Sequence, residues 1–124
     1  MLNKKVIKAL TFDTGGTVLD WHSGFKRGFQ EISDKFSLSL NCQELANELR
    51  RKSLKIVTNQ EKKSLINFDE AHRIALEELL LENSINLNDE NKKYLYYFIP
   101  SKLNVWSDFL EPFNMLKNKY VCVS

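Results

Sequence analysis

One aspartate stands at the end of an apolar run, in front of a loop that has almost no side chains. Residues 10–20 read LTFDTGGTVLD, in which Asp13 precedes Gly15, Gly16 and Thr17. A carboxylate in this position can act as a nucleophile, bind a metal ion or cap a helix. Glycines let the backbone approach a ligand closely, and successive N–H groups can bind an anion. The pattern predicts a small-ligand site, and the alternative is an ordinary turn closed by Asp13.

The residues on either side of this loop predict that it follows a buried strand. Residues 5–12, KVIKALTF, are β-branched and apolar toward their end, which is typical of a strand covered on both faces. A second such stretch, KYVCVS, occupies residues 119–124. In open α/β sheets, ligands bind beyond the carboxyl ends of the strands, and Asp13 would lie at such an end.

Apolar residues repeat at helical spacing in five segments between the two strands. We expect these helices at residues 23–36, 41–57, 67–82, 88–100 and 107–118. Ser23 is the expected cap of the first helix, and Asn67 with Glu70 resembles a capping box that opens the third. Phe36 and Leu54 are expected on the inward faces of the first two helices.

Two strands and five helices would make an incomplete α/β domain, because a two-stranded parallel sheet is rarely stable alone and has two open edges. We expect a truncated Rossmann-like core of two parallel strands in residues 1–19 and 101–124, with residues 20–100 inserted as helices. The sequence thus predicts the first half of a longer α/β protein. The alternative is a small helical domain with a peripheral pair of strands.

Composition argues against several classes of partner. The net charge is +2, and the basic stretch ELRRKSLK at 48–55 lies among acidic residues, so we interpret it as a helix face and expect no nucleic-acid partner. No apolar run approaches the roughly 18 residues that a membrane span needs, and no signal peptide is evident. Cys42 and Cys122 lie far apart, which favours free thiols in a reduced, cytoplasmic protein.

The opening loop also resembles a known motif. ALTFDTGGTVLDWHSG is similar to the first motif of the haloacid dehalogenase-like superfamily, and VLDWHS is most similar to the branch of L-2-haloacid dehalogenases. LRRKSLK at 49–55 and the helix at 68–85 resemble helices of that branch's cap, and residues 103–124 resemble its linker, helix and second core strand. The resemblance covers nearly the whole chain, but only the front half of a family member. A helical cap would explain why about a hundred residues separate the strands, where a direct crossover needs little more than a dozen.

The resemblance implies a role for each residue of the loop. Asp13 would attack carbon or phosphorus and form a covalent ester that water then hydrolyses. Thr17 and Ser124 would donate hydroxyl hydrogen bonds beside it, and Gly15 and Gly16 would bring the backbone close to the substrate.

The cap would contribute an arginine. Arg51 best matches the residue that receives the leaving halide, because an always-charged, weakly hydrated guanidinium suits a large anion. Arg50 is adjacent, and a shift of one residue in the alignment would exchange the two.

The residue at the position of Gly15 differs between the reaction classes of this superfamily. Its phosphatases carry a second aspartate there as general acid and base, whereas the dehalogenases usually carry an aromatic residue. Gly15 is neither, so the chain lacks the proton donor of the phosphatases and also the aromatic wall expected of a haloacid pocket. We expect an enzyme acting on a short 2-haloacid or similar small anion, without a cofactor. The alternatives are a phosphatase-like hydrolase, which would need Mg²⁺, and a noncatalytic helical interaction module. A homodimer through the cap is possible by resemblance.

The resemblance also implies catalytic groups that these 124 residues do not include. Family members use a lysine after the second motif, and acidic or polar residues at a fourth strand end. We therefore expect negligible turnover from this chain alone.

Overall fold

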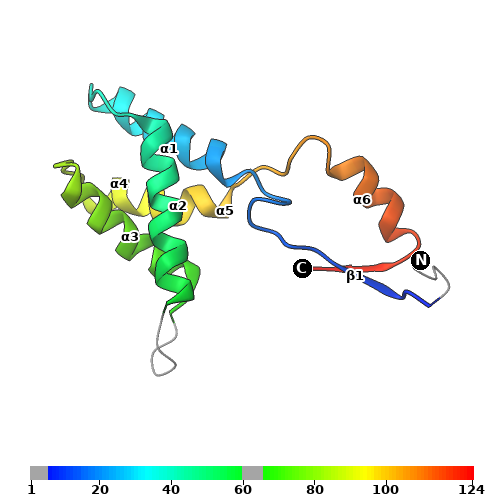
Figure 1. Cartoon of the computed structure of the whole chain (residues 1–124). Coiled ribbons are helices and arrows are strands. Elements are labelled where there is room, and N and C mark those ends of the chain that lie inside the picture. Colours follow the sequence, from blue (N-terminus) through cyan, green and yellow to red (C-terminus); the bar gives the residue numbers. More distant parts are fainter. Residues whose placement is uncertain (1–5, 60–65) are drawn as a thin grey trace. The chain divides into compact units, whose positions relative to one another are not determined.

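The computed structural model describes residues 6–59 and 66–124. The chain divides into two compact units (Figure 1). Unit 1 consists of Met1–Trp21 and Leu103–Ser124, and unit 2 of His22–Lys102. The expected boundaries, after residues 19 and 100, each differ from these by two residues.

Unit 1 is a parallel pair of short strands with one helix. Strand β1 (Ala9–Thr11) pairs with β2 (Val121–Val123), and Leu10 lies opposite Cys122. The predicted parallel pairing is confirmed, although each strand is shorter than the apolar stretch that suggested it. Helix α6 (Leu110–Lys117) packs against β2 and begins three residues later than expected. Pro112 falls in its first turn, where a missing N–H costs no hydrogen bond within the helix.

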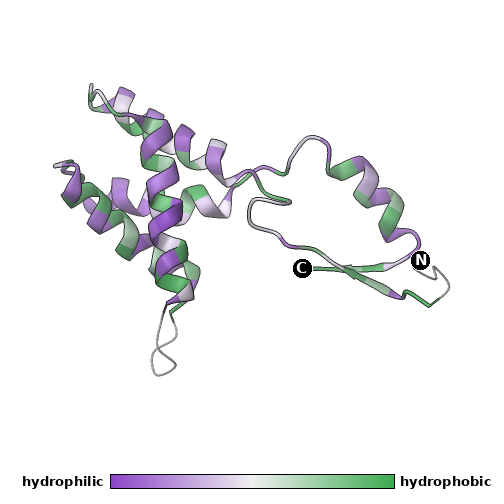
Figure 2. Cartoon of the chain, viewed as in Figure 1, coloured by the Kyte–Doolittle hydropathy of each residue, from purple (hydrophilic) through white to green (hydrophobic). Residues whose placement is uncertain are grey.

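Apolar side chains of unit 1 remain accessible to solvent. None of the residues that the structure describes in this unit is buried. Val121 is 64% exposed and Met115 is 67% exposed. Figure 2 shows the apolar colouring of β1 and β2. The two-stranded sheet therefore buries little apolar surface by itself.

The secondary-structure elements of unit 2 are all helices among its described residues. Its elements are α1 (Trp21–Lys35), α2 (Cys42–Thr58), α3 (Phe68–Glu82), α4 (Asp89–Lys93), the π-helical segment η1 (Tyr94–Phe98) and α5 (Ile99–Ser101). Asn41, Asn67 and Asn88 cap α2, α3 and α4, each accepting a hydrogen bond from the backbone N–H three residues later. These caps confirm the expected starts. The cap at Ser23 is wrong, because α1 begins two residues earlier, at Trp21.

The buried apolar residues of the described chain all lie in unit 2, where α2 packs along α3 and α3 contacts η1. Two expected inward residues are corrected by the structure. Phe36 is 43% exposed because α1 ends at Lys35 and the chain turns at Ser37, whose φ is 52°. Leu54 is 37% exposed because Ser53, four residues after the buried Leu49, takes the inward position.

The segment from α4 to α5 continues one residue past Pro100, to Ser101, where the sequence predicts an end at residue 100. Ile99 N–H donates to the carbonyl of Tyr94, five residues earlier, which is the hydrogen bond of a π-helix. The next residue, Pro100, has no N–H to donate. The chain accommodates this proline by widening the turn before it, and the helix ends at Ser101.

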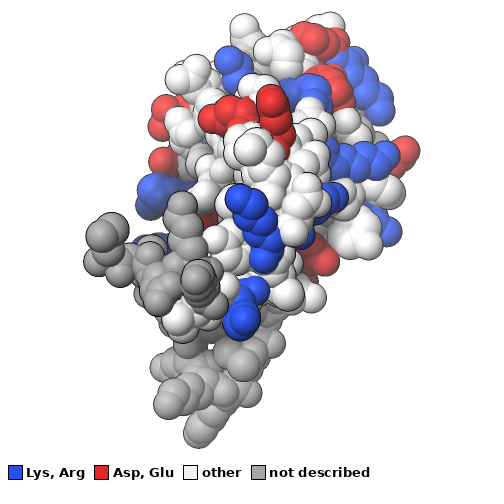
Figure 3. Space-filling view, turned by 90° about the vertical axis from the view of Figure 1, so that its right-hand side faces the viewer, with Lys and Arg blue, Asp and Glu red and all other residues white. Residues whose placement is uncertain are grey.

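Charged side chains of both signs are mixed over the face drawn in Figure 3. Lys52 is buried, and its ammonium lies 3.0 Å from Glu78 Oε1 and 2.8 Å from Glu82 Oε1. Lys52 donates hydrogen bonds to Glu82 and Glu78, and these bonds raise its pKa. Both cysteines are free thiols. None of the helices in the described part of the chain has the length and apolar character needed to span a bilayer.

Candidate active site

Asp13 lies at the edge where both strands of unit 1 end. The paired strands stop at Thr11 and Val123, and Phe12 N–H adds one more bond, 2.9 Å to the carbonyl of Val123. Asp13 and Ser124 are the next residues of the two segments, and both are exposed. Because carboxyl ends of parallel strands share one edge, the pairing places a carboxylate and a hydroxyl at the same end of the sheet.

Thr17 fixes the carboxylate of Asp13. Its hydroxyl donates a hydrogen bond of 2.8 Å to Asp13 Oδ2. The four-residue separation is closed by the turn between them, where Val18 and Leu19 N–H both donate to the carbonyl of Thr14 at 3.0 Å. The structure thus brings together two of the residues that the motif singled out.

The two glycines shape this turn. Gly16 has a φ of 93°, which favours glycine, and a Cβ there would lie 3.1 Å from Trp21 Nε1. Gly16 N–H donates to the carbonyl of Leu19 at 3.1 Å, so this amide is engaged within the loop. Gly15 is exposed and pairs with Leu19 as an isolated bridge.

The segment that leads back from the helices supports the loop. Trp106 Nε1 donates to the carbonyl of Gly16 at 3.1 Å, and Trp106 N–H donates to the carbonyl of Val18 at 3.0 Å. Asp20 N–H donates to the carbonyl of Asn104 at 2.8 Å. Trp106 is not part of the opening motif, and its indole N–H donor was the one signal in the sequence that could have indicated this role.

A cavity of about 260 Å³ lies beside the strand ends, and Ser124 and Thr14 are among its lining residues. Its aromatic wall is formed by Phe12, Phe109 and Phe113, whose ring centroids lie 5.0 to 6.0 Å apart. Asp13 is not part of the lining. The hollow is therefore an apolar space next to the hydroxyl of Ser124.

The two adjacent arginines of α2 have different surroundings. Arg51 is exposed, and its Nε lies 3.1 Å from Glu48 Oε1, within a two-point ion pair. The hydrogen bond that Arg51 donates to Glu48 raises the pKa of Arg51, and the same bond lowers the pKa of Glu48. Arg50 is half-buried, and its guanidinium lies 5.7 Å from the ring centroid of Phe68.

Within residues 6–59 and 66–124, no group of three or more His, Cys, Asp or Glu side chains is placed to hold a metal ion.

Comparisons with known proteins agree with this architecture. No protein-family model matches the chain. No curated protein matches it either. Among solved structures, it is similar to the defluorinating L-2-haloacid dehalogenase Rha0230, with a TM-score of 0.82, 23% identity and coverage of 94% of this chain and 49% of that one.

Two further solved structures have the same fold. For the L-2-haloacid dehalogenase PA0810, the TM-score is 0.82 and the identity 25%, over 94% of this chain and 50% of that one. For a third structure, of a dehalogenase, the TM-score is 0.78 and the identity 22%, over 95% of this chain and 50% of that one. The chain spans about half the length of these structures.

A parallel-stranded core interrupted by a helical cap is thus the fold class, as the sequence predicted. More narrowly, it is the fold of the L-2-haloacid dehalogenases within the haloacid dehalogenase-like superfamily, over about half of their length. The resemblance read from the opening motif is confirmed for the fold.

Proposed function

We propose that this chain supplies the nucleophile and the cap of a haloacid dehalogenase-type hydrolase that acts on a short 2-haloacid or similar small anion. The observation that carries the proposal is the hydrogen bond from Thr17 Oγ1 to Asp13 Oδ2, 2.8 Å long, at the shared end of two parallel strands. The likeness to two L-2-haloacid dehalogenases supports the same class of reaction.

In the proposed first step, an oxygen of Asp13 attacks C2 of the haloacid. A C–O bond forms while the carbon–halogen bond breaks, and its electron pair leaves with the halide. The bond from Thr17 limits rotation of the carboxylate, so that one oxygen is held back while the other faces the substrate. Water then adds to the ester carbonyl, which releases the 2-hydroxyacid and regenerates Asp13.

The remaining loop residues would hold the substrate. Ser124 would donate its hydroxyl to the substrate carboxylate from the end of β2, beside the apolar cavity. Gly15 and Gly16 would let the substrate lie against the backbone, since neither presents a side chain.

For the leaving halide, we propose an arginine of α2, with Arg51 as the better match to the family's cap arginine and Arg50 as the alternative. Glu48 pairs with Arg51 and would compete with an anion bound there. The guanidinium of Arg50 lies 5.7 Å from the ring centroid of Phe68.

A noncatalytic helical interaction module is the second candidate. It is favoured by one observation, which is that all buried apolar residues of the described chain lie in unit 2. If this alternative holds, residues 22–102 expressed alone will melt cooperatively and Asp13 will be dispensable for the chain's role.

A chimeric enzyme tests the catalytic proposal. Residues 1–124 would replace the matching half of the PA0810 dehalogenase, with which they share the fold. We expect the chimera to release chloride from L-2-chloropropionate, and the Asp13→Asn chimera to release none while remaining folded. A folded chimera without activity, or equal activity in the Asp13→Asn variant, would contradict the proposal.

Two further assays separate the alternatives. The 124-residue chain alone should have negligible turnover, because a lysine equivalent to the one after the family's second motif is not among its residues. Magnesium-dependent hydrolysis of p-nitrophenyl phosphate by the chimera would instead favour the phosphatase-like reaction, against which Gly15 argues, since it offers no proton donor.

A further inference from the structure

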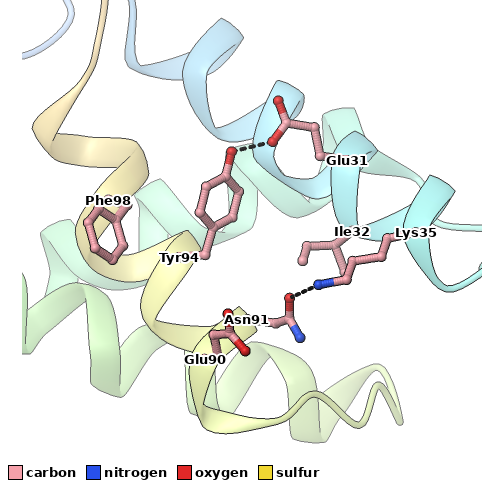
Figure 4. Close-up of a pocket in the computed structure, with 7 residues that line it drawn as sticks. All are labelled: Glu31, Ile32, Lys35, Glu90, Asn91, Tyr94 and Phe98. Carbon is pink, nitrogen blue, oxygen red and sulfur yellow. Dashed lines mark hydrogen bonds between the residues drawn. The ribbon is translucent and has the colours of Figure 1, made fainter.

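A second cavity, of about 370 Å³, lies within unit 2 between α1 and the segment formed by α4 and η1 (Figure 4). This volume is within the range of small-molecule sites. Ile32 forms an apolar part of the lining and is itself buried. The rings of Tyr94 and Phe98 stand on the opposite helix, and Phe98 is 43% exposed. One part of the cavity is therefore suited to an apolar group.

A buried amide connects the two sides of this cavity. Asn91 is only 4% exposed, and its Oδ1 accepts a hydrogen bond of 3.3 Å from the ammonium of Lys35. Its Nδ2 donates to Asn88 Oδ1 at 2.6 Å, so both ends of the amide are held. An ammonium has three N–H donors. Lys35 can therefore keep its bond to Asn91 and also donate to a ligand in the cavity.

Two carboxylates complete the polar part of the lining. Glu31 accepts a hydrogen bond from the hydroxyl of Tyr94, and Arg27 Nε lies 4.0 Å from its other oxygen. Figure 4 shows the bond between Tyr94 and Glu31, and the carboxylate of Glu31 can still accept further hydrogen bonds. Glu90 lines the cavity from α4, on the same helix as Asn91.

The widened turn of η1 is part of the same site. Tyr94 and Phe98 are the first and last residues of this π-helical segment. Interruptions of this kind are frequent at functional sites, because they change the direction of side chains along a helix. The irregular turn before Pro100 therefore carries the aromatic wall of the cavity, and charged side chains of both signs also line this cavity.

We propose that this cavity binds a small zwitterion of the apolar α-amino-acid class. The ammonium of Lys35 matches the ligand carboxylate, the carboxylate of Glu90 matches the ligand ammonium, and the surface of Ile32 and Phe98 receives the side chain. This inference does not depend on the dehalogenase-like reaction, because every residue that it uses lies in unit 2.

An NMR titration of the full chain with L-leucine tests the proposal. We expect saturable shifts of the Asn91 side-chain amide and of the α1 amides near Lys35. Two analogues each remove one charge, namely 4-methylpentanoate, which has no ammonium, and 3-methylbutylamine, which has no carboxylate. Each lost charge-assisted contact should weaken binding by about tenfold or more.

Matched variants complete the test. Lys35→Met should weaken L-leucine binding by about tenfold while leaving 3-methylbutylamine binding unchanged, and Glu90→Gln should weaken both. Glu111→Gln, on α6 in unit 1, is the control and should bind like the parent chain. Absence of saturable shifts, equal binding of L-leucine and either analogue, or unchanged binding by Lys35→Met would each overturn the proposal.

Discussion

Thr17 Oγ1 and Asp13 Oδ2 lie 2.8 Å apart in a hydrogen bond that spans the two glycines after β1. A hydroxyl that donates to a carboxylate limits the rotation of that carboxylate, and a nucleophile benefits when its attacking oxygen is already oriented. This pair is the local geometry on which the proposed reaction depends.

Replacing Thr17 by Val in the chimeric enzyme should therefore slow halide release. Removing a hydrogen bond to a charged group should lower kcat by about tenfold or more, with the chimera still folded. Thr17→Ser keeps the hydroxyl and should retain most of the activity. Steady-state kinetics with L-2-chloropropionate measure both, and equal rates for the Val and Ser variants would show that the hydroxyl does not act on Asp13.

The two arginines can be separated in the same chimera. Arg51→Gln should strongly reduce halide release, because a neutral amide cannot offset the charge that develops on the leaving atom. Arg50→Gln should have the smaller effect. The ratio of the two kcat/KM values decides between them, and the reverse order would move the assignment to Arg50.

Gly28 should tolerate no larger residue. A Cβ at this position of α1 would lie 2.9 Å from Ile99 Cγ1 and 3.1 Å from Leu95 Cδ2, and all three residues are buried. We expect Gly28→Ala to lower the free energy of unfolding by about 1–3 kcal/mol, as overpacking in cores does. Urea denaturation followed by circular dichroism measures this change.

A double-mutant cycle supplies the control for Gly28. Ile99→Ala is itself destabilising because it leaves a cavity, but it also removes both side-chain atoms nearest to the added methyl group. The double variant should therefore be more stable than the sum of the two single changes requires. Strict additivity would mean that the contact with Ile99 is not the source of the cost.

His72 makes the stability of unit 2 depend on pH. It is 5% exposed, both ring nitrogens lack hydrogen-bond partners, and its ring lies 5.4 Å from that of Phe25. Burial, with the nearby charge of Arg50, lowers the pKa of His72 from 6.5 to about 4, while Asp69 opposes the shift weakly. The folded state therefore excludes a proton that the unfolded state binds.

The sign of this effect follows from the lowered pKa. The stabilisation is complete above the unfolded-state pKa of 6.5 and is lost as pH falls toward about 4. Between pH 7.5 and 5, the free energy of unfolding should fall by about 2 kcal/mol from this group. Urea denaturation at the two pH values should show this loss in the parent chain but not in His72→Leu. An equal pH dependence in both would exclude His72 as its source.

Several features of the fold could be predicted because they depend on residues close together in the chain. Asn41, Asn67 and Asn88 cap the helices that they precede, since a cap needs only a side-chain oxygen and an N–H three residues on. The predicted helix starts were wrong where contacts with neighbouring segments decide them. Ser23 lies inside α1 rather than at its start, and α6 starts only at Leu110.

The arrangement of the opening loop could be predicted for the same reason. Asp13, Thr17 and the glycines form one continuous turn, so their relation is set by local chain geometry. The arginines of α2 could not be told apart from their spacing, because they are adjacent, and only the partners Glu48 and Phe68 distinguish them.

By itself, the sequence determined that a carboxylate ends an apolar strand, that helices separate two such strands, and that a loop with two adjacent glycines follows the first. Only the tertiary structure decided which residues meet across long separations, such as Trp106 with Gly16 and Lys35 with Asn91. The physical reason is that caps and tight turns satisfy hydrogen bonds within a few residues, whereas a partner distant in the chain is chosen by how whole elements pack.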